Sequence, residues 1–254
     1  MAHPQLSKIP PVTFAFWIMK ICATTLGETA GDLMSMTFNL GYAVSSLVLI
    51  ALFAAALTYQ LLASKFRPVL FWIVILATST AGTTMSDFMD RTLGLGYATG
   101  SVILISLLAA VLLVWRLTEG TLSVARISSR RGEAFYWTAI LFSNTLGTAL
   151  GDYLADDSGL GFLGGAALIT ALLGLVAAGH YRTKVSPVLL FWAAFILTRP
   201  FGATFGDLLT KPLAKGGLGF GTLGSSLVLF VLLAALIACS MRDRSQKEPK
   251  APAP

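Results

Sequence analysis

Apolar residues run through this chain in eight segments, each close to the ~20 residues that an α-helix needs to cross the hydrocarbon core of a bilayer. The segments fall at roughly 12–33, 42–63, 69–89, 97–117, 134–155, 162–181, 188–209 and 219–240. The odd-numbered segments mix polar with apolar residues, whereas the even-numbered ones consist almost wholly of Ala, Leu, Val and Ile. This pattern predicts an all-α membrane protein with eight transmembrane helices.

A Trp followed fifteen residues later by an Asp marks every odd segment. The four pairs are Trp17/Asp32, Trp72/Asp87, Trp137/Asp152 and Trp192/Asp207. The Trp-to-Trp steps of 55, 65 and 55 residues superpose the two halves of the chain with a shift of 120. Fifteen helical residues rise roughly 22 Å, so each Trp is expected at one membrane face, as an interface anchor, and each Asp toward the other.

Each repeat is a whole two-helix unit, so all four copies insert into the membrane in the same orientation. We therefore expect parallel repeats with a pseudo-two-fold or pseudo-four-fold arrangement about the membrane normal, rather than inverted repeats. The repeats also set the domain organisation. Residues 1–117 form the first half, 118–133 a cytoplasmic connecting loop, 134–241 the second half and 242–254 a disordered cytoplasmic tail.

The odd segments carry small residues one and five positions before each Asp, a spacing that lets membrane helices approach closely. These residues are Gly31 and Gly27, Ser86 and Gly82, Gly151 and Gly147, and Gly206 and Gly202. Positions −4, −7 and −8 share the helix face of the Asp and form a polar stripe. They hold Glu28, Thr25 and Thr24; Thr83, Thr80 and Ser79; Thr148, Thr145 and Asn144; and Ala203, Pro200 and Arg199.

Position −11 ends each polar stripe with an apolar residue. The four residues are Ile21, Leu76, Leu141 and Ile196. If the odd helices surround a central axis, their stripes form one polar cavity, open on the Asp side and closed by this apolar ring. The even helices then face lipid.

The composition agrees with a polytopic membrane protein. The 254 residues are 56% hydrophobic and 12% charged, with a mean hydropathy of +0.78, which excludes an ordinary soluble domain. The net charge of +6 resides in loops and tails rather than on one patch, so we expect no nucleic-acid partner. Cys22 and Cys239 both lie in apolar runs and suggest neither a disulfide nor a metal clip.

Basic residues divide unequally between the two sets of loops. One side has Lys8, Lys65, Arg67, Arg116, Arg126, Arg130, Arg131, Arg182, Lys184, Arg242, Arg244, Lys247 and Lys250. The other side has Arg91, Lys211 and Lys215, with Asp90, Asp156 and Asp157. The positive-inside rule then places both termini in the cytoplasm, in a multi-pass protein of the inner membrane. The opening residues show no cleaved signal peptide.

The four Trp-bearing units resemble a family of bacterial integral membrane proteins built from four tandem two-helix repeats, each with a characteristic Trp. The resemblance covers about residues 12–240 and includes all four Trp positions. It implies eight spans. It implies no activity, because the repeat is described as one of unknown function, so the chemistry must be argued from the residues.

The polar stripes supply the candidate cation-binding residues. These are Glu28, Asp32, Asp87, Asp152, Asp207, Thr24, Thr25, Asn144 and Thr148. Carboxylates within membrane spans are costly and mark pathways or sites. The ligands are all oxygen, which suits hard cations such as Mn²⁺, Mg²⁺ or Ca²⁺, and also protons or Na⁺. Glu28 and Asp32 are four residues apart on one helix face, so they are the candidate metal ligands.

Two basic residues within the spans are candidate counter-ions for these acids. Arg199 lies two helical turns from Asp207 and is expected to face Glu28 or Asp32. Lys20 falls on the glycine side of its helix, where it would pair with an acid or extend toward the interface. Pro200 is expected to kink its span. The alternative for Arg199 is that it only neutralises excess acid.

These residues favour a cation transporter, with a divalent metal such as manganese as substrate and proton exchange as the coupling. A carrier of small organic cations and a non-transporting structural or sensor protein remain alternatives. An intramembrane enzyme is disfavoured, because the sequence has no nucleophile–base pair or phosphate loop. We expect no cofactor besides a metal as substrate, and partners limited to the cation and the lipid bilayer, with a homo-oligomer left open.

Overall fold

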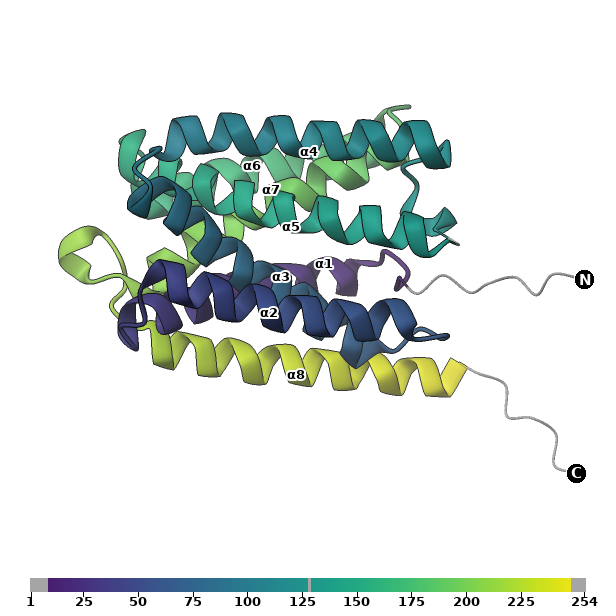
Figure 1. Cartoon of the computed structure of the whole chain (residues 1–254), viewed down its shortest axis with the longest axis horizontal. Helices are drawn as coiled ribbons and strands as arrows, with labels where there is room; N and C mark the ends of the chain where they lie inside the picture. The colour runs from purple at the N-terminus through teal and green to yellow at the C-terminus, as the bar shows by residue number, and fades with distance from the viewer. Residues whose placement is uncertain (1–8, 128, 248–254) are drawn as a thin grey trace, which may run out of the picture.

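The computed structural model describes residues 9–127 and 129–247, and within these ranges all regular structure is helical (Figure 1). The long helices are α1 (Phe14–Asp32), α2 (Gly41–Leu62), α3 (Pro68–Asp87), α4 (Tyr97–Glu119), α5 (Arg130–Asp152), α6 (Gly161–Arg182), α7 (Pro187–Thr210) and α8 (Thr222–Lys247). The prediction of eight helices is confirmed. Their order follows the eight apolar segments, and their bounds agree to within about four residues except at the end of α8, which extends to Lys247.

Six of the eight helices are long and apolar enough to cross a membrane: α2, α3, α4, α6, α7 and α8. The helices α1 and α5 fall outside this set. Charged residues lower the mean hydropathy of both, with Lys20, Glu28 and Asp32 in α1 and Glu133 and Asp152 in α5. All five of these charged side chains are buried inside the bundle.

The four odd helices form a closed ring at the centre of the bundle. The helix α1 packs against α3 and α7, and α5 packs against the same two helices. Each even helix lies outside the ring on the odd helix of the following repeat: α2 on α3, α4 on α5, α6 on α7, and α8 on α1. The two halves are thus interlocked, because α4 covers α5 of the second half and α8 covers α1 of the first.

The glycines five residues before each motif Asp make close helix–helix contacts in the ring. Each of these glycines faces the residue that lies eight positions before the motif Asp of the neighbouring helix. The four contacts are Gly27 with Ser79, Gly82 with Asn144, Gly147 with Arg199, and Gly202 with Thr24. A Cβ at any of these glycines would overlap or crowd its neighbour. One contact thus repeats around the ring, which explains the small-residue spacing in the sequence.

The outer faces of the even helices are apolar and exposed, as Leu47, Leu117, Leu163 and Val228 illustrate. Their sequences are apolar nearly all round, because one face meets the ring and the other faces outward. The chain enters α1 and leaves α8 at the same end of the bundle (Figure 1). We call this the tryptophan end, and the opposite end, formed by residues 33–40, 88–96, 153–160 and 211–221, the aspartate end.

Most of the four motif Trp residues do not face lipid. Trp72, Trp137 and Trp192 are buried and Trp17 is partly buried. They pack with Phe16, Phe71, Tyr136 and Phe191 in an aromatic layer. The expectation of interface anchors is therefore wrong for three of them, because their side chains are buried against other aromatic residues and do not face lipid.

Two boundaries differ from the sequence-based expectation. The connection between the halves is shorter than 118–133, because α4 extends to Glu119 and α5 begins at Arg130. The loop between them folds onto the bundle, where the Trp192 Nε1 donates a hydrogen bond to the Leu122 carbonyl at 3.1 Å. At the end of the chain, α8 remains helical over 242–247, where we expected a disordered tail. Residues 248–254 of that tail lie outside the described residues.

Candidate functional site: a layered ionic core

The motif aspartates meet at the aspartate end of the ring, where each is only 3% exposed. A π-helical turn follows the Asp in the first three repeats, at Leu33–Thr37, Phe88–Thr92 and Tyr153–Asp157. In the fourth repeat α7 instead continues to Thr210 and a short turn follows at Leu213–Lys215. These turns bring the basic side chains that follow the helices back toward the carboxylates.

Two basic residues return over the four aspartates, and each joins two of them. Arg91 places Nε 2.9 Å from Asp87 Oδ1 and Nη2 3.0 Å from Asp152 Oδ2. Lys211 places Nζ 2.7 Å from Asp32 Oδ2 and 3.0 Å from Asp207 Oδ1. The upper layer of the core thus consists of two similar triads, each with one cation from an even repeat.

The expectation that Arg91 and Lys211 are merely loop charges is wrong. Both lie four residues after a motif Asp, and the two positions are 120 residues apart, the same shift that superposes the halves. An i, i+4 pair on a helical turn faces one way, so each base was within reach of its own Asp. The sequence signal was present, and the neighbouring Asp from the next repeat completes the contact.

Lys211 lies just beyond the span that ends at Thr210. Burial of its ammonium opposes the charged form, but Asp207 and Asp32 outweigh burial and raise the pKa of Lys211 above its ordinary value. Lys211 therefore remains a cation throughout the physiological pH range.

The middle layer of the core is an ion pair between Glu28 and Arg199. Arg199 Nη1 lies 3.0 Å from Glu28 Oε2, with side-chain exposures of 0% and 3%. Arg199 Nη2 also donates to the hydroxyls of Thr83 and Thr148 and to the Ser79 carbonyl. The structure thus brings Glu28, Thr148 and Arg199 together from three helices, and adds Thr83 to them.

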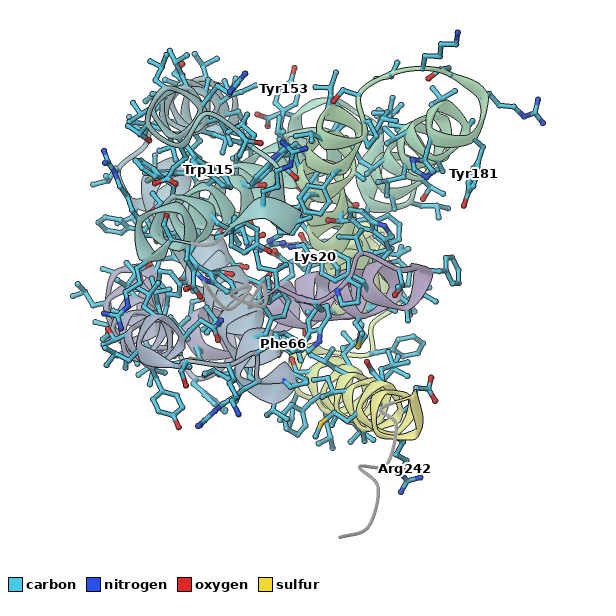
Figure 2. The ribbon with its side chains drawn as sticks, turned by 90° about the vertical axis from the view of Figure 1, so that its right-hand side faces the viewer. Lys20, Phe66, Trp115, Tyr153, Tyr181 and Arg242 are labelled. Carbon is cyan, nitrogen blue, oxygen red and sulfur yellow. The ribbon has the colours of Figure 1, made fainter. Side chains whose placement is uncertain are left out.

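The lower layer contains Lys20, which lies near the centre of the bundle in the end view of Figure 2. Its Nζ lies 3.4 Å from Asn144 Oδ1 and 4.1 Å from the centre of the Phe195 ring. Asn144 in turn donates to Thr78 Oγ1 at 2.9 Å. Lys20 is fully buried, so the expectation that it lies outside the polar stripe is wrong. Its contacts in the described residues are an amide and a ring rather than an acid.

The apolar ring expected at position −11 is replaced by a layer at −12 that is apolar in three repeats and holds Lys20 in the first. Ile21, Leu76, Leu141 and Ile196 are only partly buried. The fully buried residues at this depth stand at −12: Lys20, Ile75, Ile140 and Phe195. Positions −4, −8 and −12 are buried in all four repeats, as expected where two helices pack along ridges formed by every fourth residue.

Two of the candidate hydroxyl ligands do not reach the carboxylates. Thr25 donates to the Ile21 carbonyl of its own helix at 3.0 Å. Thr24 donates to carbonyls of its own helix and to the Thr198 carbonyl of α7 at 3.2 Å. Both hydroxyls are thus used in helix packing, the ordinary role of Thr in membrane helices.

Three carboxylates from two helices converge above the middle layer. One oxygen each from Glu28, Asp32 and Asp207 lies within 4.8 Å of the others, and all three residues are buried. Asp87 and Asp152 lie outside this group and belong to the Arg91 triad. The arrangement offers oxygen ligands of the kind that hard cations prefer. Glu28 and Asp32 were expected as a pair, while Asp207 is added by the packing of α7 on α1.

A cavity of about 430 Å³ opens beside Asp32 at the aspartate end. Its lining residues are Asp32, Met36, Thr37, Thr210, Lys211, Phe220, Gly221, Thr222, Leu223 and Gly224. The lining combines one carboxylate, one ammonium and three hydroxyls with apolar side chains. Of the three-carboxylate group, Asp32 lines this cavity, which lies along the start of α8.

Charges in the core nearly cancel. Five carboxylates, on Glu28 and the four motif Asp residues, face four cationic side chains, on Lys20, Arg91, Arg199 and Lys211. The core therefore carries one excess negative charge when every group is ionised. A buried network of this kind is stable only if its members remain paired.

An all-helical bundle with a ring of four repeated helices around buried ion pairs defines a polytopic protein of the membrane type. The family model described as Repeat of Unknown Function (DUF347) matches residues 15–66, 70–121, 135–186 and 190–246, and the chain belongs to this family. The resemblance noted from the four Trp units is thereby confirmed. No curated protein and no solved structure matches the chain.

Proposed function

We propose that this protein is a multi-pass transporter of cations in the inner membrane, with eight spans and both termini in the cytoplasm. Burial within the ring would shield the charged residues of α1 and α5 from lipid, so these two helices can span with the other six. Topology follows from the loops. The described residues of the aspartate end carry three basic side chains, of which Arg91 and Lys211 are paired with aspartates, against many at the tryptophan end.

The observation that carries the proposal is the convergence of Glu28, Asp32 and Asp207, two of which, Asp32 and Asp207, already hold a cation, the Lys211 ammonium. One carboxylate is enough to neutralise a lysine. Here three carboxylates each place one oxygen within 4.8 Å of the others. Three oxygens at such separations can share one metal ion. We therefore propose a divalent metal such as manganese as the substrate, because its ligands are carboxylate and hydroxyl oxygens.

Proton exchange offers a way to couple cation movement to an energy source. The core has nearly equal numbers of acids and bases, so a divalent ion entering it leaves excess positive charge unless protons or a tethered cation leave the acids. Glu28 is the natural coupling residue, because it belongs both to the three-carboxylate group and to the Arg199 ion pair. A metal that attracts Glu28 would weaken its bond to Arg199 and free α1 to move relative to α7.

The interlocked helices restrict the form of that movement. Because α8 packs on α1 and α4 packs on α5, the two sequence halves cannot rock as separate bodies without breaking these contacts. We propose instead that each odd helix moves together with the even helix that covers it. The Glu28–Arg199 contact lies between two such pairs, α8–α1 and α6–α7.

A small organic cation is the second candidate substrate. The specific observation in its favour is the cavity beside Asp32, whose Met36, Phe220 and Leu223 side chains would contact a carbon skeleton. A divalent ion has no need of such a lining. A packing or sensor role is the alternative outside transport, since every motif aspartate is paired with Arg91 or Lys211.

The test is flux into proteoliposomes with a panel of cations: Mn²⁺, Mg²⁺, Ca²⁺, Na⁺ and methylammonium. Transport predicts saturable uptake of one class by the wild type and its loss in Asp32→Asn and Glu28→Gln, provided that both variants retain their fold. Asp157→Asn is the matched control, because this carboxylate at the same end is exposed and outside the core. A protein that folds with high stability and moves no member of the panel would point to the packing role.

A further inference from the structure

Lys211 and Arg91 occupy equivalent positions in the two halves of the chain, but they hold their aspartates differently. Arg91 uses two separate nitrogens, one for Asp87 and one for Asp152, so its planar group fixes the geometry of both. Lys211 holds Asp32 and Asp207 with one nitrogen at the end of a flexible stem. A third carboxylate, Glu28, lies close to this pair. Lys211 therefore fills the position that a free cation would take.

The backbone at Lys211 is not part of a helix. Lys211 ends α7 with extended backbone angles, φ −70° and ψ 152°, and Pro212 follows it. Arg91, by contrast, is inside the π-helical turn Phe88–Thr92. The Lys211 side chain can thus leave its aspartates without unwinding a helix.

Space for this movement lies beside the ion pair. Lys211 and Asp32 both line the cavity of about 430 Å³, and so does Thr210. Thr210 is 8% exposed, and its Oγ1 has no hydrogen-bond partner among the described residues. A buried hydroxyl without a partner is costly. It becomes satisfied if an ammonium or a cation with its water enters the cavity next to it.

We propose that Lys211 is a tethered competitor for the cation site, held between Asp32 and Asp207 when no substrate is bound and displaced into the cavity when a cation arrives. The inference rests on the proposed function and concerns regulation of the same site. The exchange keeps the local charge close to constant, because one cation replaces another. Return of the ammonium to the aspartates expels the substrate, so Lys211 sets both affinity and release.

Labelling of the wild-type protein gives the first test. The purified protein in detergent is treated with an amine-reactive reagent with or without saturating MnCl₂, and the modified lysines are quantified by mass spectrometry. The expected result is faster labelling of Lys211 with Mn²⁺ present and no change at Lys215, which is exposed on the same loop. Tetramethylammonium chloride, an organic cation with no N–H that could consume the reagent, stays present during labelling and serves as the second probe. Unchanged or slower labelling of Lys211 at a saturating concentration of a bound cation would overturn the inference.

Variants give the second test. Lys211→Met removes the competitor and should tighten the binding of the transported cation by about tenfold or more, with slower release, within the range typical of coupled sites. Lys211→Arg keeps the charge and should bind no more tightly than the wild type, and Lys215→Met should bind as the wild type does. Equal or weaker binding in Lys211→Met, together with normal flux in the wild type, rejects the competitor and leaves transport standing.

The outcomes also distinguish a failure of the proposed transport function from a failure of the proposed role of Lys211. If no variant binds or moves a cation, the proposed function and the competitor fail together. If Lys211→Met binds a cation that the wild type does not, the competitor is supported although transport is not. If Lys211→Met does not fold, the labelling of the wild-type protein alone decides.

Discussion

Replacement of Glu28 by Gln tests how the middle layer of the core is held together. Glu28 supplies the carboxylate partner of Arg199, and both side chains are almost completely buried. Gln keeps the size of Glu and can accept a hydrogen bond, but it removes the negative charge. Arg199 then remains as a charged group inside the ring without its carboxylate.

The size of the effect follows from what remains around Arg199. Breaking a buried ion pair by removing one partner costs about 3–5 kcal/mol. The Thr83 and Thr148 hydroxyls and the Ser79 carbonyl still accept from Nη2. We therefore expect the lower end of that range, about 3 kcal/mol. Removing both charges in the Glu28→Gln/Arg199→Met double variant should restore most of this loss, to within about 1 kcal/mol of the wild type.

The assay is reversible unfolding in mixed micelles of rising SDS content, followed by Trp fluorescence. Asp157→Asn makes the same carboxylate-to-amide change at an exposed position and should leave the unfolding midpoint unchanged. The reasoning is refuted if Glu28→Gln unfolds at the same midpoint as Asp157→Asn. It is also refuted if the stability lost by the double variant equals the sum of the losses in Glu28→Gln and Arg199→Met, because that would show no coupling between Glu28 and Arg199.

Three further predictions concern packing and charge. Gly147→Ala should destabilise the bundle by about 1–3 kcal/mol, because the new methyl group meets the Arg199 side chain, whereas Gly174→Ala, with open space around it, should be neutral or slightly stabilising; equal midpoints would contradict this. Lys20→Met should be neutral or stabilising in the same assay, because burial of the Lys20 ammonium is costly and is offset only by its contacts with one amide oxygen and one aromatic ring; a loss of stability comparable to that of Glu28→Gln would show an acidic partner. The stability difference between the wild type and Lys211→Met should not decrease from about pH 6 to pH 9, because the raised pKa of Lys211 keeps its ammonium charged and its stabilising contribution in place over this range; a decline would count against the Lys211 triad.

The helices and the ring could be anticipated because both follow from short-range patterns. Each apolar run is long enough for one span, and the glycine at −5 recurs in all four copies, so the packing of one pair predicts the rest. The sequence does not show which even helix covers which odd helix. Short turns suggest that α2 folds back on α1, but the structure places α2 on α3. Apolar outer helices can pack on either neighbour, and hydropathy does not distinguish the two.

The ionic core could be anticipated in composition but not in pairing. The acids, Asn144 and Arg199 were all visible as polar residues in otherwise apolar runs. The roles of Arg91 and Lys211 were missed, since a base close to a helix end ordinarily reads as a solvated loop charge. Lys20 was misplaced because its position was judged on a straight helix with 3.6 residues per turn, while the crossing helices turn every fourth residue toward the axis.

A structure determined with Mn²⁺ tests the central claim most directly, because manganese can be located by its anomalous scattering. The account predicts one anomalous peak bounded by Glu28, Asp32 and Asp207, with the Lys211 ammonium withdrawn toward Thr210. For an organic substrate, methylammonium should displace Lys211 in the same way. A fully loaded protein with no cation at this place, and with Lys211 still bound to Asp32 and Asp207, would contradict the account.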